Sequence, residues 1–195
     1  MRRPSSRLAE GLLTHFSRQP IDVGRALRQW EGYRAALHDN GWETIEAPPV
    51  DDCPDGVFIE DTMVTYADVA VIAHPGASER RPEIPGAELA VRSLGYRIAR
   101  ITSPGTLDGG DVLKHDRTVW VGIGDRTNSE GARQLAAALQ PLGAREVEGP
   151  FTKVLHLKSA VTALPDGTVL GHPSFVDDPD FFPKYLEVPE PDGAH

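Results

Sequence analysis

The 195-residue sequence predicts an α/β fold built from a unit that repeats about every fifty residues. Glycines suited to end helices stand at Gly41, Gly95 and Gly143. A strand pattern and then a proline, at position 48, 104 or 150, follow each of them. One loop, hairpin, helix and strand cannot bury its own apolar faces, so the copies must share a core. This arrangement is typical of an α/β propeller.

The first unit begins with an irregular segment, residues 1–17, and a helix. Apolar residues at helical spacing run from Val23 to Leu37, and Asn40-Gly41 supplies the stop. Residues 42–47 predict a short strand that ends before two prolines. A polar loop then leads into a hairpin with strands at 63–66 and 69–73.

The same order of elements continues along the chain. We expect a helix over 82–94 and a strand over 96–101, then a hairpin with strands at 112–114 and 119–122. A helix capped by Thr127 or Asn128 runs towards Gly143, followed by a strand at 144–147. A third hairpin, 160–164 and 168–172, and a strand at 185–188 complete the pattern. A fourth hairpin and a fifth unit are missing from it, so we expect one α/β-propeller domain, 1–195, incomplete at its ends.

Composition excludes several classes of function. The net charge of −9 argues against a nucleic-acid partner, because phosphate binding depends on clustered Lys and Arg. An acidic protein can still bind a small cation. No apolar run approaches the ~20 residues of a membrane helix, and no hydrophobic stretch follows the basic N-terminus, so we expect a cytoplasmic protein without a membrane partner. The single cysteine, Cys53, excludes an internal disulfide and a multi-cysteine metal site.

Polar residues recur in the loops that precede the hairpins. In a closed ring these loops would meet near the axis, bringing together Asp55, Glu60 and Asp61 from one copy, Asp108 from the next and His156 from the third. A histidine among carboxylates is suited to proton transfer, although a histidine between two leucines is also common as a packed strand residue.

Each of the other polar groups has two interpretations. The three acidic residues of the first loop could form a solvated face, a metal cage or a guanidinium site. Asp108 and Asp111, on either side of Gly109-Gly110, could be turn residues that only shape a hairpin. Arg80 and Arg126, near predicted helix starts, could clamp a carboxylate or lie on the surface.

Five segments together resemble the dimethylarginine dimethylaminohydrolases, a family with a five-unit α/β propeller. They match in order over nearly the whole chain and comprise residues 58–62 (FIEDT), 75–77 (PGA), 104–111 (PGTLDGGD), 126–128 (RTN) and 155–159 (LHLKS). The resemblance implies hydrolysis of Nω,Nω-dimethyl-L-arginine or its monomethyl analogue to L-citrulline and a methylamine, without metal or organic cofactor. The expected partner is this small molecule, and a homodimer is a candidate assembly.

The resemblance also implies roles for individual residues. Asp55, Glu60 and Asp61 would hold the guanidinium and amine ends of the substrate, and Leu12 would supply a backbone contact near the entrance. His156 would be the acid/base, oriented by Asp108. Arg80 and Arg126 would bind the α-carboxylate.

The nucleophile is the departure from the family pattern. Family members carry a catalytic cysteine in the last unit, and this chain has none there. Cys53 lies in a loop that matches the binding segment, so we expect the 195-residue chain to be inactive without further sequence. Two alternatives stay open: a relative that acts on arginine or agmatine, as a deiminase or amidinotransferase, and a non-catalytic guanidine-binding propeller segment.

Overall fold

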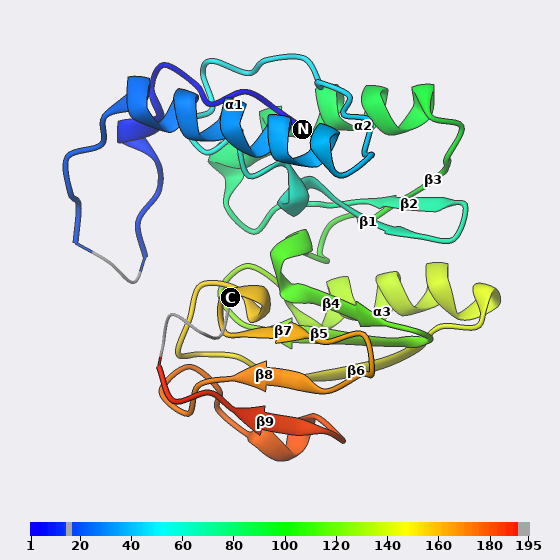
Figure 1. The fold of residues 1–195 in the computed structure, drawn as a ribbon. Coiled ribbons are helices and arrows are strands. Elements are labelled where there is room, and N and C mark those ends of the chain that lie inside the picture. Colours follow the sequence, from blue (N-terminus) through cyan, green and yellow to red (C-terminus); the bar gives the residue numbers. More distant parts are fainter. Residues whose placement is uncertain (15–16, 191–195) are drawn as a thin grey trace.

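The computed structural model describes residues 1–14 and 17–190, which form three small mixed sheets with helices packed against them (Figure 1). Each sheet has three strands in sequence order. The first two form an antiparallel hairpin and the third lies parallel to the second. No helix in the described part of the chain is long and apolar enough to cross a membrane.

The first sheet contains β1 (Met63–Tyr66), β2 (Val69–Ile72) and β3 (Arg97–Arg100). Helix α2 (Ile84–Ser93) connects β2 to β3, because parallel strands need a crossover connection. A 3₁₀ helix, Ser78–Glu83, leads into α2 and carries Arg80.

The second sheet repeats this order with β4 (Val112–His115), β5 (Thr118–Ile123), α3 (Ser129–Leu139) and β6 (Arg145–Pro150). The Asn128 side chain caps α3 by accepting the Gly131 N–H. The third sheet contains β7 (Val161–Ala163), β8 (Val169–Gly171) and β9 (Tyr185–Glu187), and a 3₁₀ turn, Pro179–Phe181, stands where the other copies have an α-helix.

The predicted internal repeat is therefore confirmed. The leading strands begin at Met63, Val112 and Val161, with equal spacing between successive copies. The predicted helix stops Gly41, Gly95 and Gly143 all have positive φ, a conformation that favours glycine. Closure into a propeller remains a prediction.

The N-terminal part confirms one expected element and corrects another. Helix α1 (Val23–Asp39) is capped by Asp22, whose side chain accepts the Arg25 N–H. The strand predicted at 42–47 is wrong. Strands need a neighbouring ladder, and among the described residues this segment pairs with no strand. Its Ala47 N–H donates to the Met1 carbonyl, its Ile45 carbonyl accepts from the Met1 ammonium group, and its Trp42 N–H donates to the Leu37 carbonyl.

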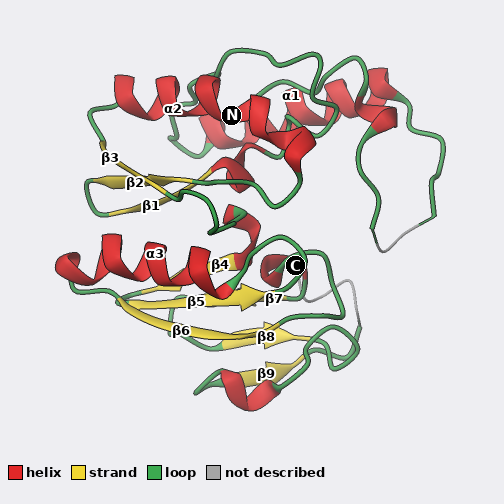
Figure 2. Ribbon diagram, turned by 180° about the vertical axis from the view of Figure 1, so that it is seen from behind, coloured by secondary structure: helices red, strands yellow, loops and turns green. Residues whose placement is uncertain are grey.

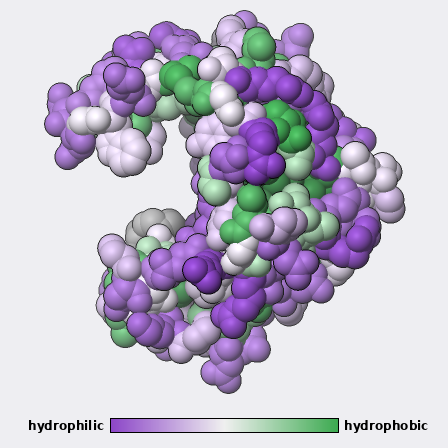
Figure 3. Space-filling view, turned by 90° about the vertical axis from the view of Figure 1, so that its right-hand side faces the viewer, coloured by the Kyte–Doolittle hydropathy of each residue, from purple (hydrophilic) through white to green (hydrophobic). Residues whose placement is uncertain are grey.

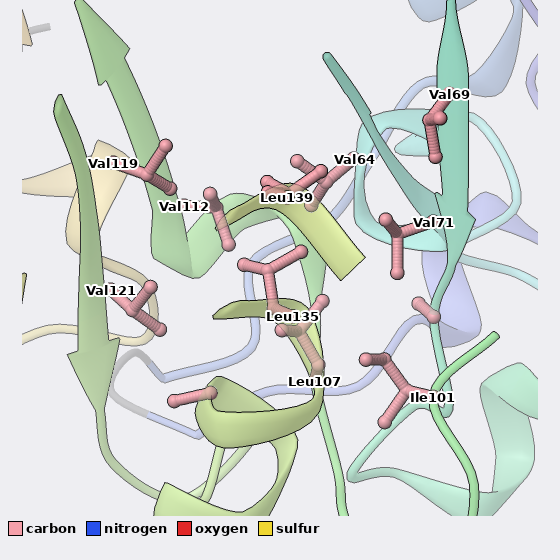
Figure 4. Packing of buried hydrophobic residues seen from close by; sticks show 12 residues of the cluster. Val64, Val69, Val71, Ile101, Leu107, Val112, Val119, Val121, Leu135 and Leu139 are labelled. Carbon is pink, nitrogen blue, oxygen red and sulfur yellow. The ribbon is translucent and has the colours of Figure 1, made fainter. Parts of the chain in front are cut away.

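The copies share apolar cores. Side chains of β2, β4, β5 and α3 form one cluster between the first and second sheets (Figure 4). Residues along β2 alternate, with Val69 and Val71 in this cluster and Ala70 and Ile72 against α2. Seen from behind, α3 lies between the two sheets (Figure 2), and its Leu135 is completely buried. Burial of one such leucine contributes about 1.5–3 kcal/mol.

A second cluster joins Leu113 and Trp120 of the second sheet to Val161 and Val169 of the third. The molecular surface is hollowed on one side, between the part that carries α1 and the part that carries the third sheet (Figure 3). Neighbouring copies thus bury each other's faces, as the repeat requires.

Candidate active site

A cavity of about 710 Å³ gathers residues from all three repeats and from the N-terminal segment. Among its lining residues are six of the predicted site residues: Leu12, Asp55, Asp61, Arg80, Arg126 and His156. Exposed apolar side chains at its border include Leu13, Ile21 and Phe58. Polar groups that are far apart in sequence therefore converge on one hollow with an apolar border.

His156 is held in this cavity by Asp111. It precedes the 3₁₀ turn Leu157–Ser159, and its Nδ1 lies 3.2 Å from Asp111 Oδ1. The same oxygen accepts the Leu157 N–H at 3.2 Å, and Thr127 Oγ1 donates to Asp111 Oδ2 at 2.6 Å. Because Asp111 accepts from Nδ1, the nitrogen left to exchange a proton is Nε2, 3.7 Å from Asp61 Oδ2.

The charge state of His156 follows from two opposed effects. Burial alone would lower its pKa, because an imidazolium loses hydration. The hydrogen bond to Asp111 and the negative charges of Asp61, Asp111 and Asp108 outweigh burial, so the pKa of His156 is raised. An imidazole with a raised pKa can hold a proton near neutrality and release it to a departing nitrogen.

The expected contact between Asp108 and His156 is corrected by the structure. Asp108 accepts the Gly76 N–H at 3.1 Å and lies 3.5 Å from Arg126 Nη1, whereas Asp111 contacts the histidine. The two aspartates stand at opposite ends of one 3₁₀ turn, in which the Asp111 N–H bonds to the Asp108 carbonyl. Both were visible in the sequence, but no local signal indicates which side chain turns towards residue 156.

Asp108 is nevertheless an unusual carboxylate. It is completely buried, and its Oδ2 has no hydrogen-bond partner among the described residues. Burial and the nearby charge of Asp61 raise the pKa of Asp108 to about 6. Ionised Asp108 thus contributes negative charge beside Arg126 only at neutral and higher pH.

Asp61 is the carboxylate best placed to meet a cation in the cavity. Its Oδ1 accepts the Gly110 N–H at 2.9 Å, and its Oδ2 accepts from Arg80 Nη1 at 2.5 Å. A Cβ on Gly110 would lie 2.6 Å from Asp61 Oδ1 and 2.8 Å from His156 Cγ. Only glycine lets the backbone approach both side chains so closely.

The outer part of the cavity pairs Asp55 with Leu12. The Leu12 N–H donates to Asp55 Oδ2 at 2.9 Å, which ties the N-terminal segment to the loop before β1. This agrees with a backbone position for Leu12 near the cavity.

Glu60 does not lie with these residues, which corrects its predicted place. Its carboxylate pairs with Lys158 Nζ, and both residues line a second cavity, of about 620 Å³, formed with Trp42 and Met63. Neighbouring residues of the 3₁₀ helix Ile59–Thr62 point in different directions, so Asp61 and Glu60 serve different cavities.

Arg80 and Arg126 differ in how many hydrogen bonds and ion pairs their side chains make within the protein. Arg80 bonds to both Glu83 oxygens, to Asp61 and to the Phe58 carbonyl, and its side chain is 5% exposed. Burial alone would lower the pKa of Arg80, but Glu83 and Asp61 raise it. Among the described residues, the Arg126 side chain forms one ion pair, the 3.5 Å approach of its Nη1 to Asp108 Oδ2, and its other N–H groups are donors that could meet a ligand anion.

Cys53 lies apart from this constellation. It is buried, its Sγ faces the Glu79 carbonyl at 3.7 Å, and it is not among the residues that line the cavity. Burial and the charge of Glu83 raise the pKa of the Cys53 thiol, which makes the thiolate scarce.

Comparison with known proteins identifies the relatives of this chain. The arginine deiminase family model matches residues 40–182. A dimethylarginine dimethylaminohydrolase of Streptomyces coelicolor is 58% identical over 195 residues, which cover 100% of this chain and 76% of the relative. The dimethylarginine dimethylaminohydrolase of Pseudomonas aeruginosa is 35% identical over 191 residues, which cover 97% of this chain and 75% of the relative. The structure of a cysteine-to-serine mutant of the Pseudomonas aeruginosa protein, complexed with citrulline, superposes with a TM-score of 0.88 at 34% identity, covering 96% of this chain and 74% of that chain.

Proposed function

Because this chain belongs to the arginine deiminase family, among the dimethylarginine dimethylaminohydrolases, we propose that it binds Nω,Nω-dimethyl-L-arginine for hydrolysis to L-citrulline and dimethylamine. The observation that carries the proposal is the juxtaposition of Asp61 and His156 in one cavity, with the histidine held by Asp111. A carboxylate beside an acid/base suits a cationic guanidinium whose carbon–nitrogen bond must be cleaved. The shared repeat and the convergent loops favour the closed α/β propeller as the complete fold.

The other cavity residues fit the remaining groups of this amino acid. Arg126 is the main candidate for the α-carboxylate, with one Arg80 N–H as a second donor. Asp55 and the backbone at Leu12 lie at the outer end, where an α-ammonium group would need an acceptor. Asp108, ionised above about pH 6, keeps Arg126 turned towards the cavity.

The proposed chemistry proceeds in two displacements. A thiolate sulfur attacks the guanidinium carbon and forms a C–S bond, the bond from this carbon to dimethylamine breaks, and protonated His156 gives its proton to the departing nitrogen. Water then attacks the same carbon, His156 takes a proton from it, and the C–S bond breaks to return the thiolate and release citrulline. Cys53 is not a suitable thiolate, since it is buried away from the cavity. We therefore propose that the 195-residue chain binds the substrate but releases no citrulline, with Cys53→Ser changing neither result.

Titration calorimetry with four ligands tests the proposal: dimethylarginine, L-arginine, citrulline and agmatine, which lacks the carboxylate. We expect dimethylarginine to bind and agmatine to bind about tenfold more weakly, because an arginine–carboxylate hydrogen bond is lost. Arg126→Met should abolish this difference, whereas Arg117→Met, at an exposed position, should preserve it.

Each other outcome identifies an alternative. Preference for arginine or agmatine over dimethylarginine would favour a deiminase or amidinotransferase relative. Binding of none of the four ligands would refute the proposal, and citrulline release that Cys53→Ser abolishes would refute the assignment of the thiol.

A further inference from the structure

Glu83 is a fully buried carboxylate between two arginines, outside the residues predicted for the site. Its side chain has no exposed surface. Arg80 donates to both of its oxygens, from Nε to Oε1 and from Nη2 to Oε2, each at 2.9 Å. On the other side, Arg2 Nη1 lies 3.8 Å from Glu83 Oε2, and the Arg2 side chain is likewise fully buried. A charge in such a place is strongly destabilising unless it is paired, so its retention calls for a role.

The buried charges form an alternating row that ends in the cavity. Glu83 holds Arg80 through a bidentate (two-pronged) ion pair, and Arg80 donates to Asp61 from Nη1 alone. Arg80 Nη2 also donates to the Phe58 and Asp55 carbonyls, at 3.0 and 3.2 Å. The charges thus alternate in space in the order Arg2, Glu83, Arg80 and Asp61. His156 Nε2 lies 3.7 Å from Asp61 Oδ2.

Arg80 is a potential competitor for the ligand. Its guanidinium has the same charge and shape as the group that Asp61 is proposed to bind, and a two-pronged Arg80–Asp61 pair would occupy both oxygens. Glu83 takes the two-pronged contact instead, so that Arg80 offers Asp61 a single N–H. Asp61 thereby keeps acceptor capacity for a second guanidinium.

We propose that Glu83 is a positioning residue of the guanidinium site, which restrains Arg80 so that Asp61 remains available to the ligand. This inference rests on the proposed function and adds to it a determinant of affinity for cationic ligands. Arg2 belongs to the same arrangement, because its positive charge balances the negative charge of Glu83. It also donates to the carbonyls of Pro48, Gly56 and Glu83 itself, which joins the loop of Asp55 to the segment of Arg80.

The test compares two ligands that differ in charge: cationic dimethylarginine and neutral citrulline. In Glu83→Gln the two-pronged contact is lost and Arg80 is free to pair fully with Asp61. We expect dimethylarginine affinity to fall about tenfold or more, as for a lost charge-assisted contact, with citrulline affinity changing less than about threefold. Glu79→Gln, an exposed position of the same 3₁₀ helix, is the matched control and should change neither affinity.

The outcomes separate positioning from general structural damage. Equal losses for both ligands, or no loss for either, would overturn the inference. If Glu83→Gln does not fold, the double variant Arg2→Met/Glu83→Gln removes both members of the buried pair, and the same ratio of affinities is measured on it. Failure of the unaltered chain to bind dimethylarginine would overturn the proposed function together with this inference. Binding with an unchanged ratio in the variants would overturn this inference alone.

Discussion

Replacing Asp108 by asparagine should stabilise the protein at alkaline pH and leave it almost unchanged in acid. The pKa of Asp108 is raised from 3.8 to about 6 by burial and by the charge of Asp61. A raised pKa of a carboxyl in the folded state means that the folded protein holds a proton that the unfolded chain has lost. The associated stability is fully present below the unfolded value, 3.8, and is lost as pH rises through the folded value, about 6.

The size of this effect follows from the two pKa values. Each pKa unit corresponds to about 1.4 kcal/mol, so ionised Asp108 destabilises the fold by about 3 kcal/mol at pH 8 and by well under 1 kcal/mol near pH 4. Asparagine resembles the protonated acid and can keep the acceptor for the Gly76 N–H. Asp108→Asn should therefore be about 3 kcal/mol more stable than the unaltered protein at pH 8.

Urea unfolding of both proteins at pH 4, 6 and 8 measures this difference. Asp116→Asn, in the turn between β4 and β5 with a side chain 86% exposed, removes the same charge and should show no comparable trend with pH. A difference between Asp108→Asn and the unaltered protein that stays constant from pH 4 to pH 8 would refute the reasoning. So would destabilisation at pH 8, since it would mean that the contact with Arg126 outweighs the cost of burial.

Two further predictions concern the same network. Asp111→Asn should lower the pKa of His156, because the Asp111 charge would no longer oppose the effect of burial. Histidine proton resonances followed through a pH titration measure this pKa. Asp125→Asn, at an exposed position, is the control. An unchanged titration would contradict the role of Asp111. Gly110→Ala should lower the free energy of unfolding by about 1–3 kcal/mol, because the added Cβ would clash with Asp61 and His156. Gly32→Ala in α1 should raise it by about 0.5–1 kcal/mol, because no atom lies within 4 Å of the added Cβ and alanine favours a helix. Equal urea midpoints for the two alanine variants would show that Gly110 is not sterically required.

The amino-acid sequence alone was enough to predict the repeated unit and most of its elements. Hairpin, helix and parallel strand depend on local signals: helix-stop glycines such as Gly95, the N-cap Asn128 and alternating apolar residues in the strands. These signals act within a few residues, so they can be read without knowing the packing. The prediction of a strand at 42–47 was wrong because it depends on packing: an extended segment becomes a strand only when a neighbouring strand pairs with it.

The site was predictable as a set of residues and not as a set of contacts. The repeat predicted that Asp55, Asp61 and His156 would meet, and the family resemblance added Arg80 and Arg126; all five line one cavity. It could not show that Glu60 turns to Lys158, or that Asp111 and not Asp108 holds His156. Adjacent or near-adjacent carboxylates have the same chemistry, and only the path of the backbone through a 3₁₀ turn decides which of them faces the cavity.

Tertiary structure alone revealed the buried charges that support the site. Arg2 and Glu83 are far apart in sequence, and neither stands in a motif that indicates a partner. Thr127 likewise contributes through contacts that no motif indicates, since its hydroxyl donates to Asp111 and accepts the Asp108 N–H. A buried charge is tolerated where an opposite charge and hydrogen-bond partners meet it in space, and that meeting depends on how the copies pack. The sequence therefore determined which chemistry the loops carry, and packing of the repeats determined which side chains perform it.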